Sequence, residues 1–476
     1  MTELNFDCLT LIFDELRTDK KSLHSCLFVN KKWCNIVVPI LWKYSLYNLS
    51  KQKEEKIFNI ILSCLPLSSK QLLLVNDIKL SSKIFLNTPT FNYISFCKFP
   101  ENEVIRKIIE MVLGDLRRYY KRNILEQEIY KLFVSQCKNI GELRWQTLQP
   151  LSLFPGASTC FSQLYNLFID VFSLNSDTLY EMSKFCKNLN SLSIHNFSKD
   201  LPGLVSLIDA QVNLRRVNLC TIFKGGNCEE LSKALTRKCN TISYLSFNSI
   251  GTIPPSFLSS LVNLKWLSIF NNEDYEDIED DIKELQKYLS ISEFPNLQYL
   301  NINGLSCFKE LSMLVEKTKG NLSHIDIFNI DRDIAKNTGM LIKAITENCP
   351  NIKLLFTYLE PQDFIHIKSL LINCRYLKTI RFDSLDFFMD ENDNNIGDEL
   401  LDILISFSPK CLNDITISKS WKFSINTFER FFESFRDRPL HYYYMICHGR
   451  SYITEEHKIM VKQYIEEGVI KYSSFS

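Results

Sequence analysis

The chain has 476 residues, enough for about three domains of ordinary size and for a sizeable core without disulfide or metal staples. Its 55 basic and 55 acidic residues give a formal net charge of zero, so no global field directs it toward nucleic acid or an anionic membrane. Hydrophobic residues make up 45% and charged residues 23%, and with only 13 Gly and 14 Pro this composition excludes wholesale disorder and collagen-like or linker-rich architectures.

The first residues and the cysteines indicate the compartment. Glu3, Asp7 and Asp14 interrupt the apolar positions near the N-terminus, which is unlike a signal or transit peptide. No apolar run approaches the length of about 18 residues that spans a bilayer. The 16 cysteines include no C-x-x-C pair, which argues against zinc and redox motifs and predicts free thiols. We therefore expect a cytoplasmic or nuclear protein that needs no metal and no cofactor and does not enter a membrane.

The N-terminal segment 1–46 differs in pattern from the rest of the chain. Residues 5–17 form a helical stripe that covers more than half of the circumference, and residues 19–29 and 31–42 give two more short helical patterns. About 40 residues with this much apolar surface should need a partner surface. The stripe consists of Cys8, Leu9, Ile12, Phe13 and Leu16, widened by Leu4 and Leu11.

These three blocks resemble an F-box, as in fungal F-box proteins with C-terminal repeats. The matching sequence runs from Leu4 to Leu16, from Leu23 to Trp33 and from Leu41 to Lys43. Asn5 replaces the usual proline and can cap the first helix instead. The resemblance implies a surface that binds a Skp-type adaptor. The residues that lie at or behind this surface are Leu4, Cys8, Leu9, Ile12, Phe13, Leu16, Leu41 and Trp42. The alternative is that these residues only face the protein's own repeats.

Residues 47–135 predict a packed, helix-rich bridge with degenerate repeats. Residues 53–65 and 103–134 have helical periodicity, and the break at Thr88 to Phe91 precedes a possible early repeat strand at Phe91, Ile94 and Phe96. No Ser/Gly/Pro-rich linker is present, so we expect the bridge to hold the N-terminal segment rigidly.

A short pattern, apolar-x-x-apolar-x-apolar, recurs along residues 136–476 with a mean period of about 27 residues. The last positions of each unit alternate, as a half-buried strand requires, and helical spacing follows. One strand and one helix cannot bury their own faces, so the units must stack into a solenoid. The pattern starts at Ile140, Leu164, Leu189, Leu214, Ile242, Leu264, Leu297, Leu322, Ile352, Leu377, Leu412 and, more weakly, Leu440.

This region resembles cysteine-containing leucine-rich repeats over residues 136–446. Five units carry a cysteine three positions before the first apolar residue of the strand pattern. The resemblance implies that these thiols end the helices and stack as small buried hydrophobes. The expected fold class is α/β, a three-helix F-box followed by a leucine-rich-repeat solenoid with strands on the concave face and helices on the convex face. The five cysteines are Cys137, Cys186, Cys239, Cys349 and Cys374.

Positions between the core residues of each repeat strand should point to the concave face. In the middle and C-terminal units these positions carry aromatic side chains among Asn, Ser and single charges, a pattern typical of a protein-binding patch. The high aromatic content of the chain offers a purely compositional explanation. The candidate target-binding residues are Tyr244, Trp266, Phe270, Tyr299, His324, Phe328, Phe356, Tyr358 and Arg381.

Three features of the C-terminal half have ordinary explanations. Residues 272–284 and 383–399 are acidic insertions and should form solvated loops near one rim, because the second lacks the Gly and Glu of a calcium loop. Residues 454–470 predict a terminal helix that caps the solenoid. His441, His448 and His457 have no matching acid or thiol spacing and are expected at the surface.

No catalytic motif or phosphate-binding loop is present, so we expect a non-catalytic protein. The leading hypothesis is a substrate receptor of an SCF-type cullin-RING ubiquitin ligase, whose F-box binds the adaptor, and through it a cullin, and whose repeats bind a protein target. The alternative is an F-box repeat scaffold that delivers nothing to a ligase. Recognition of a small ligand or nucleic acid would need a polar pocket or a basic stripe. A phosphate-dependent target is disfavoured because Arg144, Arg216 and Arg381 lie far apart in the sequence.

Overall fold

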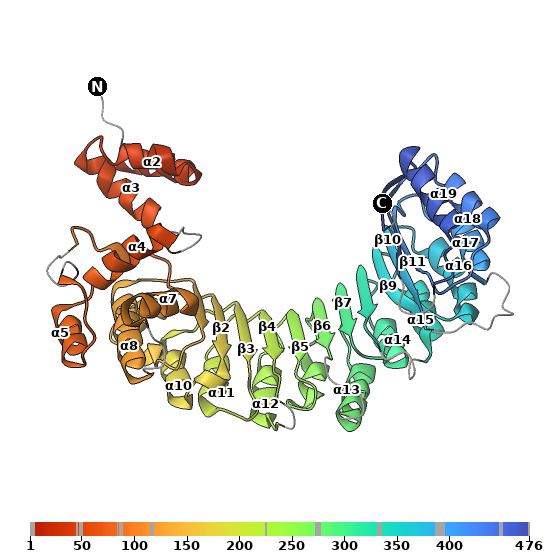
Figure 1. The fold of residues 1–476 in the computed structure, drawn as a ribbon. Helices are drawn as coiled ribbons and strands as arrows, with labels where there is room; N and C mark the ends of the chain where they lie inside the picture. Colours follow the sequence, from red (N-terminus) through yellow and green to blue (C-terminus); the bar gives the residue numbers. More distant parts are fainter. Residues whose placement is uncertain are drawn as a thin grey trace. The chain divides into compact units, whose positions relative to one another are not determined.

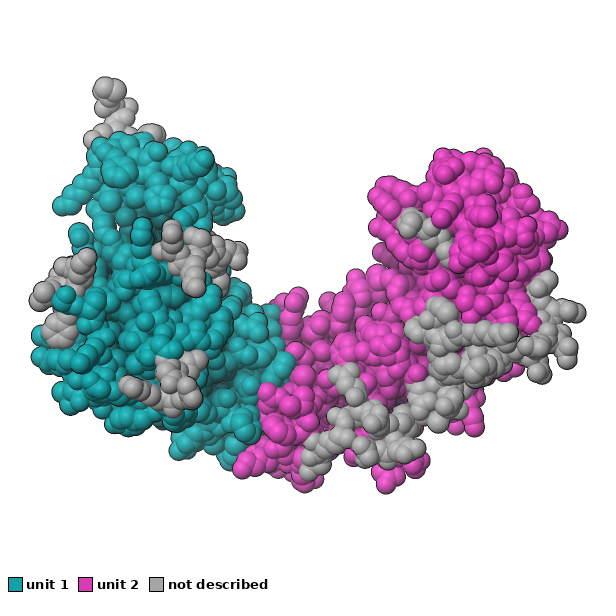
Figure 2. Space-filling view, in the orientation of Figure 1, with its two compact units in different colours: residues 1–195, 201–214 teal, residues 196–200, 215–476 magenta. Residues whose placement is uncertain are grey.

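The structure is a computed structural model of the whole chain. It describes all residues except 1–4, 44–45, 47–50, 83, 85–88, 115–118, 224–225, 272–277, 331–335, 386–395, 447–450 and 475–476. Leu4 and His448, and much of both acidic insertions, therefore lie outside the described residues. The chain forms two compact units, one of residues 1–195 and 201–214 and the other of residues 196–200 and 215–476 (Figure 2). The expected division at residues 46 and 135 stays a prediction.

The N-terminal module, residues 5–43, is a bundle of three short helices, as the sequence predicts. Asp19 caps the second helix, because its carboxylate accepts hydrogen bonds from the N–H groups of Lys21 and Ser22, both at 3.2 Å. Phe13 lies at the centre of a small core, with its ring 4.9 Å from that of Trp33. The helices are α1 (Phe6–Glu15), α2 (Lys20–Cys26) and α3 (Lys31–Lys43), with the 3₁₀ turn η1 (Leu16–Thr18) after α1.

The described secondary-structure elements of the bridge are all helices, joined by turns and coil. The strand expected near Phe91 is instead a 3₁₀ turn, because the side chain of Asn92 accepts the N–H of Ser95 and caps it. This turn contacts the N-terminal module, where the rings of Trp42 and Tyr93 lie 4.4 Å apart. The elements are α4 (Lys51–Ser63), α5 (Leu67–Val75), η2 (Tyr93–Phe96), α7 (Asn102–Leu113) and α8 (Tyr119–Gln136).

Three parallel repeat strands complete the first unit. Successive residues of each strand alternate between buried and at least partly exposed, and the apolar residues of the repeat pattern are the buried ones. Helix α11 begins with Pro202 and packs closely on α10, since a Cβ at Gly203 would lie only 1.9 Å from the backbone oxygen of Ser176. The elements are β1 (Glu142–Trp145), η3 (Leu151–Leu153), α9 (Ala157–Phe161), β2 (Asn166–Asp170), η4 (Val171–Ser173), α10 (Ser176–Phe185), β3 (Ser191–His195) and α11 (Pro202–Asp209).

The second unit contains the longer part of the repeat array. Its strands pair in parallel and in chain order, and helices cover one face of the sheet (Figure 1). We call the opposite face the open face. The strands are β4 (Arg216–Cys220), β5 (Tyr244–Asn248), β6 (Trp266–Phe270), β7 (Tyr299–Asn303), β8 (His324–Phe328), β9 (Leu354–Leu359), β10 (Thr379–Ser384), β11 (Asp414–Ser418), β12 (Leu440–Ile446) and β13 (Ile470–Ser473).

The covering elements follow the strands one by one. Most repeats have an α-helix here, whereas the repeat of β5 has only a 3₁₀ helix that starts at a Pro-Pro pair. They are α12 (Glu229–Arg237), η5 (Pro255–Ser260), α13 (Glu279–Ile291), α14 (Phe308–Glu316), α15 (Thr338–Asn348), η7 (Pro361–Asp363), α16 (Phe364–Asn373), α17 (Ile396–Phe407), α18 (Ile425–Glu433) and α19 (Glu455–Glu466). The second half of the acidic stretch 272–284 thus belongs to α13, whose positive N-terminal end favours carboxylates.

All twelve repeat strands expected from the sequence are present, which confirms the leucine-rich-repeat solenoid. The expected ending is wrong in one respect: α19 does not terminate the sheet, because β13 follows it and pairs with β12. His457 is also not a surface residue. It is buried at the start of α19, where Nδ1 accepts the N–H of Thr454 and Nε2 bonds the backbone oxygen of Phe423. Burial lowers the pKa of His457.

Two side-chain ladders join successive repeats. Cys137, Cys186, Cys349 and Cys374 are buried, as the resemblance implied, and Cys239 is half-buried. Burial raises the pKa of the Cys349 and Cys374 thiols to about 12, so these two thiols stay neutral and unreactive. The second ladder consists of asparagines just before the repeat pattern, whose amides donate to a carbonyl of the preceding repeat. These bonds are Asn263 to Asn240 (3.2 Å), Asn321 to Pro295 (2.9 Å) and Asn351 to Gly320 (3.2 Å).

A buried glutamine joins two repeats of the first unit. The side chain of Gln211 accepts the N–H of Leu189 at 2.9 Å and donates to the backbone oxygens of Cys186 and Leu207 at 2.8 and 2.7 Å. Each backbone group that loses a buried partner costs about 1–3 kcal/mol. We expect Gln211→Leu to lower the free energy of unfolding by about 2–4 kcal/mol in urea denaturation followed by circular dichroism. The exposed substitution Asn213→Leu should change it little, and equal losses in both variants would contradict this assignment.

Candidate protein-binding surfaces

The N-terminal module exposes apolar side chains outside its core. Leu11 is 70% exposed on α1, and the next residue, Ile12, is 45% exposed. In the turn after α2, Phe28 is 88% exposed, and Val29 is exposed next to it. A three-helix bundle this small cannot turn all of its apolar side chains inward. The module therefore presents an unpartnered apolar surface, which is typical of an interaction site.

The expected adaptor residues divide into an exposed and an internal group. Cys8 and Ile12 are exposed on α1, in line with direct contact. Leu9 and Phe13 are buried in the module's core, and Leu16 and Leu41 pack against that core, so these four lie behind the surface. Trp42 contacts Tyr93 of the bridge and faces the chain itself. Sequence reasoning did not include Phe6, Leu11, Phe28 and Val29, all exposed, although the breadth of the stripe was a signal for Leu11.

Four rings stack in one row across β5 to β8 on the open face. The first residues of these strands are register partners, so their side chains lie side by side. The ring centroids of Tyr244 and Trp266 are 5.3 Å apart, those of Trp266 and Tyr299 are 4.4 Å apart, and those of Tyr299 and His324 are 4.4 Å apart. The guanidinium of Arg216 lies 5.7 Å from the Tyr244 ring and ends the row on β4. We call Tyr244, Trp266, Tyr299 and His324 the ring row.

The ring row presents ring edges and polar atoms to its surroundings. Because each inner ring stacks on a neighbour, its two faces are occupied by the chain itself. The indole N–H of Trp266 and the side-chain oxygen of Asn301, on neighbouring strands, have no hydrogen-bond partner among the described residues. Buried polar atoms rarely remain unpaired in folded proteins. Both atoms are buried, so they lie beneath the accessible surface of the ring row.

The other candidate target-binding residues extend the open face around the ring row. Phe270 and Phe328 end β6 and β8 and are half-buried. Phe356 lies between Asp326 and Arg381 in the strand register, and the Arg381 guanidinium is 5.9 Å from the Phe356 ring. Half-buried aromatic and charged side chains of this kind combine contact area with hydrogen-bonding capacity.

Tyr358 corrects the sequence prediction. It is only 3% exposed, so it cannot contact a target directly. The strict alternation of a half-open strand ends here, because Thr357, Tyr358 and Leu359 are buried in succession, as are Phe382, Asp383 and Ser384 on β10. Consecutive buried residues indicate a strand covered on both faces. The accessible part of the open face thus stops before the ends of β9 and β10.

A second aromatic cluster on β12 and β13 was missed by the sequence analysis. Tyr442 stacks between Tyr444 and Tyr472, with centroid separations of 5.7 and 5.2 Å. His441 packs edge-on against Tyr442 and lies 3.5 Å from a carboxylate oxygen of Asp414 on β11. The repeat pattern was weak at Leu440 and gave no indication of β13. The three consecutive tyrosines at 442–444 were the available signal.

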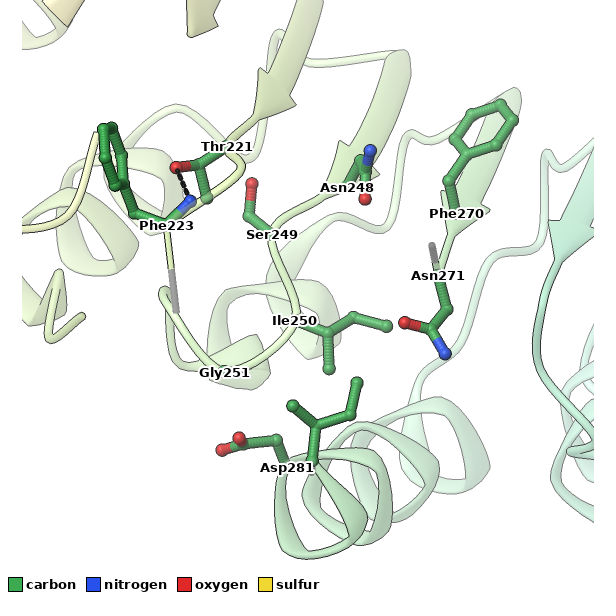
Figure 3. A pocket seen from close by; sticks show the side chains of 10 residues that line it. Thr221, Phe223, Asn248, Ser249, Ile250, Gly251, Phe270, Asn271 and Asp281 are labelled. Atoms are coloured by element: carbon green, nitrogen blue, oxygen red, sulfur yellow. Dashed lines mark hydrogen bonds between the residues drawn. The ribbon is translucent and has the colours of Figure 1, made fainter. Parts of the chain in front are cut away.

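The described residues border two open hollows, of about 530 Å³ at residues 148–178 and about 420 Å³ at residues 439–471, and one much smaller cavity. A cavity at the ends of β5 and β6, bordered by Asn248, Phe270 and Asp281, has a volume of about 20 Å³, which holds about one water molecule (Figure 3). Across the described parts of the chain, no three His, Cys, Asp or Glu side chains converge on a metal position. Within the described residues, no single helix is long and apolar enough to span a membrane. The helices at residues 53–63 and 67–75 reach that length and hydropathy only when taken together, and they are bent by 103° relative to each other.

Comparisons with known proteins leave the function open. No protein-family model matches the chain, and no curated protein matches it. Among solved structures, the chain is similar to an internalin (inlF) from Listeria monocytogenes, with 14% identity over 74% of this chain and 92% of that one and a TM-score of 0.36. It is also similar to Rad7 in the Rad7 and Elc1 complex of yeast, with 15% identity, coverage of 78% and 79%, and a TM-score of 0.37.

A third similar structure is a protein from Bacteroides fragilis, with 13% identity, coverage of 55% and 64%, and a TM-score of 0.29. At these scores the likenesses assign no function. The leucine-rich-repeat assignment rests on the strands and helices of the chain itself.

The electrostatics of the open face centre on Asp326. Burial raises the pKa of this carboxyl to about 6, and the positive charge of Arg381 partly opposes the rise. Burial and the nearby charge of Lys353 lower the pKa of His324, two residues away on the same strand, so His324 is neutral at pH 7. The open face therefore gains negative charge between about pH 5 and pH 7, when Asp326 ionises.

Asp326 predicts a pH dependence of stability. Its pKa is raised in the folded state above its value in the unfolded chain, so the folded state prefers the protonated form. The stabilisation from this preference is complete below about pH 4 and is lost as the pH rises through about 6. We expect Asp326→Asn to be more stable than the parent by about 1–3 kcal/mol at pH 8 in urea unfolding, with the difference shrinking toward pH 4.

The control for this prediction is Asp437→Asn, at an exposed carboxylate of the second unit. It should track the parent at both pH values. A stability difference between Asp326→Asn and the parent that is the same at pH 4 and pH 8 would contradict the assignment of the titration to Asp326.

Proposed function

We propose that this protein is a substrate-recognition subunit of an SCF-type cullin-RING ubiquitin ligase. In this proposal the N-terminal module is an F-box that docks a Skp-type adaptor, and through it a cullin, while the open face of the repeats binds the target protein. The chain itself is non-catalytic and acts in the cytoplasm or nucleus. Its contribution to ubiquitin transfer is positioning, which raises the effective concentration of the target near the transferring subunits.

The observation that supports the adaptor half is the apolar surface of the N-terminal module. The F-box-like sequence falls within its three helices and the turns between them, and its core is complete without Leu11, Ile12, Phe28 and Val29. Large exposed apolar side chains at adjacent positions cost solubility unless another surface covers them. An adaptor that buries these side chains would remove their apolar surface from water.

The target half is supported by the ring row and its surroundings. Aromatic side chains with a polar atom contribute strongly to protein interfaces because they bury much area and lose little conformational entropy. Here they are pre-organised by stacking and by the strand register, so little ordering remains to be done on binding. The resulting surface suits an extended segment of another protein.

The adaptor proposal predicts the effect of substitutions at exposed positions. Leu9 and Phe13 are unsuitable, because charging these core residues would unfold the module and mimic a loss of docking. We expect Leu11→Asp with Phe28→Asp to weaken binding of a purified Skp-type adaptor at least about tenfold by calorimetry, since desolvated apolar contacts become charged. The thermal unfolding of the variant should match that of the parent.

The matched control is Leu74→Asp with Val75→Asp, at exposed apolar positions of α5, where Val75 is 83% exposed. This variant should bind the adaptor as the parent does. An intact chain that fails to bind the adaptor would refute the proposal, as would equal weakening by both variants. Adaptor binding without ubiquitination of any captured protein by the assembled ligase would favour the alternative, a repeat scaffold that delivers no substrate.

A further inference from the structure

The residue just before each repeat strand forms a continuous row along one edge of the second unit's sheet. Backbone hydrogen bonds of 2.8 to 3.0 Å connect the row from repeat to repeat, as in the bond from Lys378 N–H to the oxygen of Lys353. In chain order the row reads Arg215, Ser243, Lys265, Gln298, Ser323, Lys353, Lys378 and Asn413. Four of these positions carry a basic residue and none carries an acidic one.

The four basic side chains, which we call the basic row, are exposed and uncompensated. Arg215, Lys265, Lys353 and Lys378 are all exposed, and within the described residues none of them forms an ion pair with a carboxylate. Lys353 and Lys378 precede neighbouring strands, about 4.8 Å apart and within one Debye length of about 8 Å, so these two charges reinforce each other. The net charge of zero for the whole chain conceals this local field.

The basic row and the ring row are parts of one surface. Each residue of the basic row immediately precedes the first residue of a strand, which is the position that the ring row occupies on β5 to β8. Arg216 extends the positive charge onto the face, where its guanidinium lies over Tyr244. The charge of Lys353 is close enough to His324 to lower the pKa of that imidazole.

This arrangement favours a polypeptide over a nucleic acid. Single-stranded nucleic acids bind by stacking bases on exposed aromatic faces. In the ring row the faces of Trp266 and Tyr299 are covered by neighbouring rings, so edges remain for a ligand. Ring edges carry partial positive charge and attract carboxylates, as does the basic row.

We propose that the basic row and the ring row together bind an extended, Asp/Glu-rich segment of a partner protein. From β4 to β10 the basic row spans six strand spacings, about 29 Å, which corresponds to about nine extended residues. The segment runs across the strands, with its carboxylates toward the exposed side chains of Arg215, Lys265, Lys353 and Lys378 and its other atoms against the edges of the ring row. This inference rests on the target-binding half of the proposed function and names the chemistry of that target.

The test measures binding of a defined peptide to the full chain. The probe is a fluorescent peptide of about twelve residues that alternates Glu and Ser, and its partner has Gln at every Glu. We expect the Glu peptide to bind at least about tenfold more tightly than the Gln peptide in fluorescence anisotropy, with affinity falling as salt rises. Lys353→Glu with Lys378→Glu should weaken binding of the Glu peptide at least about tenfold, because two attractive charges become repulsive.

The matched control changes the same net charge on the helical face. Lys309→Glu with Lys343→Glu alters two exposed lysines of α14 and α15 and should leave the affinity within about twofold. The inference is overturned if the Glu peptide does not bind, if both variants weaken it equally, or if a single-stranded oligothymidine of similar charge binds more tightly and loses affinity in Lys353→Glu with Lys378→Glu.

The same samples separate this inference from the proposed function. Adaptor binding is measured for Lys353→Glu with Lys378→Glu and should equal that of the parent, because the substitutions lie in the repeats. If the unsubstituted chain binds the adaptor but not the Glu peptide, the acidic-segment inference is refuted and the ligase proposal is not. Peptide binding without adaptor binding supports it and refutes the ligase proposal.

Discussion

The in-phase hydrogen bonding of successive parallel strands is the constraint on which the rest of this structure depends. A single strand and helix cannot bury their own apolar faces, so each repeat is stable only against its neighbours. In the second unit the register continues from strand to strand, for example from Trp266 to Tyr299 and from Tyr299 to His324. Side chains far apart in the sequence therefore become neighbours in rows. The ring row and the basic row occupy two successive positions of the repeat, and each row exists because the strand register aligns its position from repeat to repeat.

The repeats and the N-terminal module use apolar surface in opposite ways. In the repeats, neighbouring units cover almost every leucine and isoleucine of the pattern, and the buried cysteines and glutamine fill the remaining polar and small positions. The N-terminal module has no such neighbour for Leu11 or Phe28, since its helices are few and short. The burial of apolar surface is thus nearly complete within the solenoid, whereas in the module part of the apolar surface stays exposed. This contrast is why we place adaptor binding on the module and target binding on the open face.

Sequence reasoning succeeded where the physics is periodic. The repeat pattern gave the strands correctly because alternation and helical spacing are local properties of the chain. It failed where coverage depends on distant residues: Tyr358 occupies a face position by sequence but is buried by packing at the ends of β9 and β10, and β13 has no repeat pattern of its own. His457 was misplaced for a similar reason, because its partner Phe423 precedes it by more than one repeat.

By itself, the sequence determined the solenoid, the order of its strands, the three N-terminal helices and the rows to which the face residues belong, because each follows from local periodicity and short-range helix signals. Only the tertiary structure decided which of these side chains remain accessible, how the rings of Trp266 and Tyr299 stack, and that Lys353 and Lys378 join Arg215 and Lys265 along one edge. Accessibility, stacking and charge clustering depend on distances between repeats. Those distances are set by packing and strand pairing rather than by neighbours along the chain.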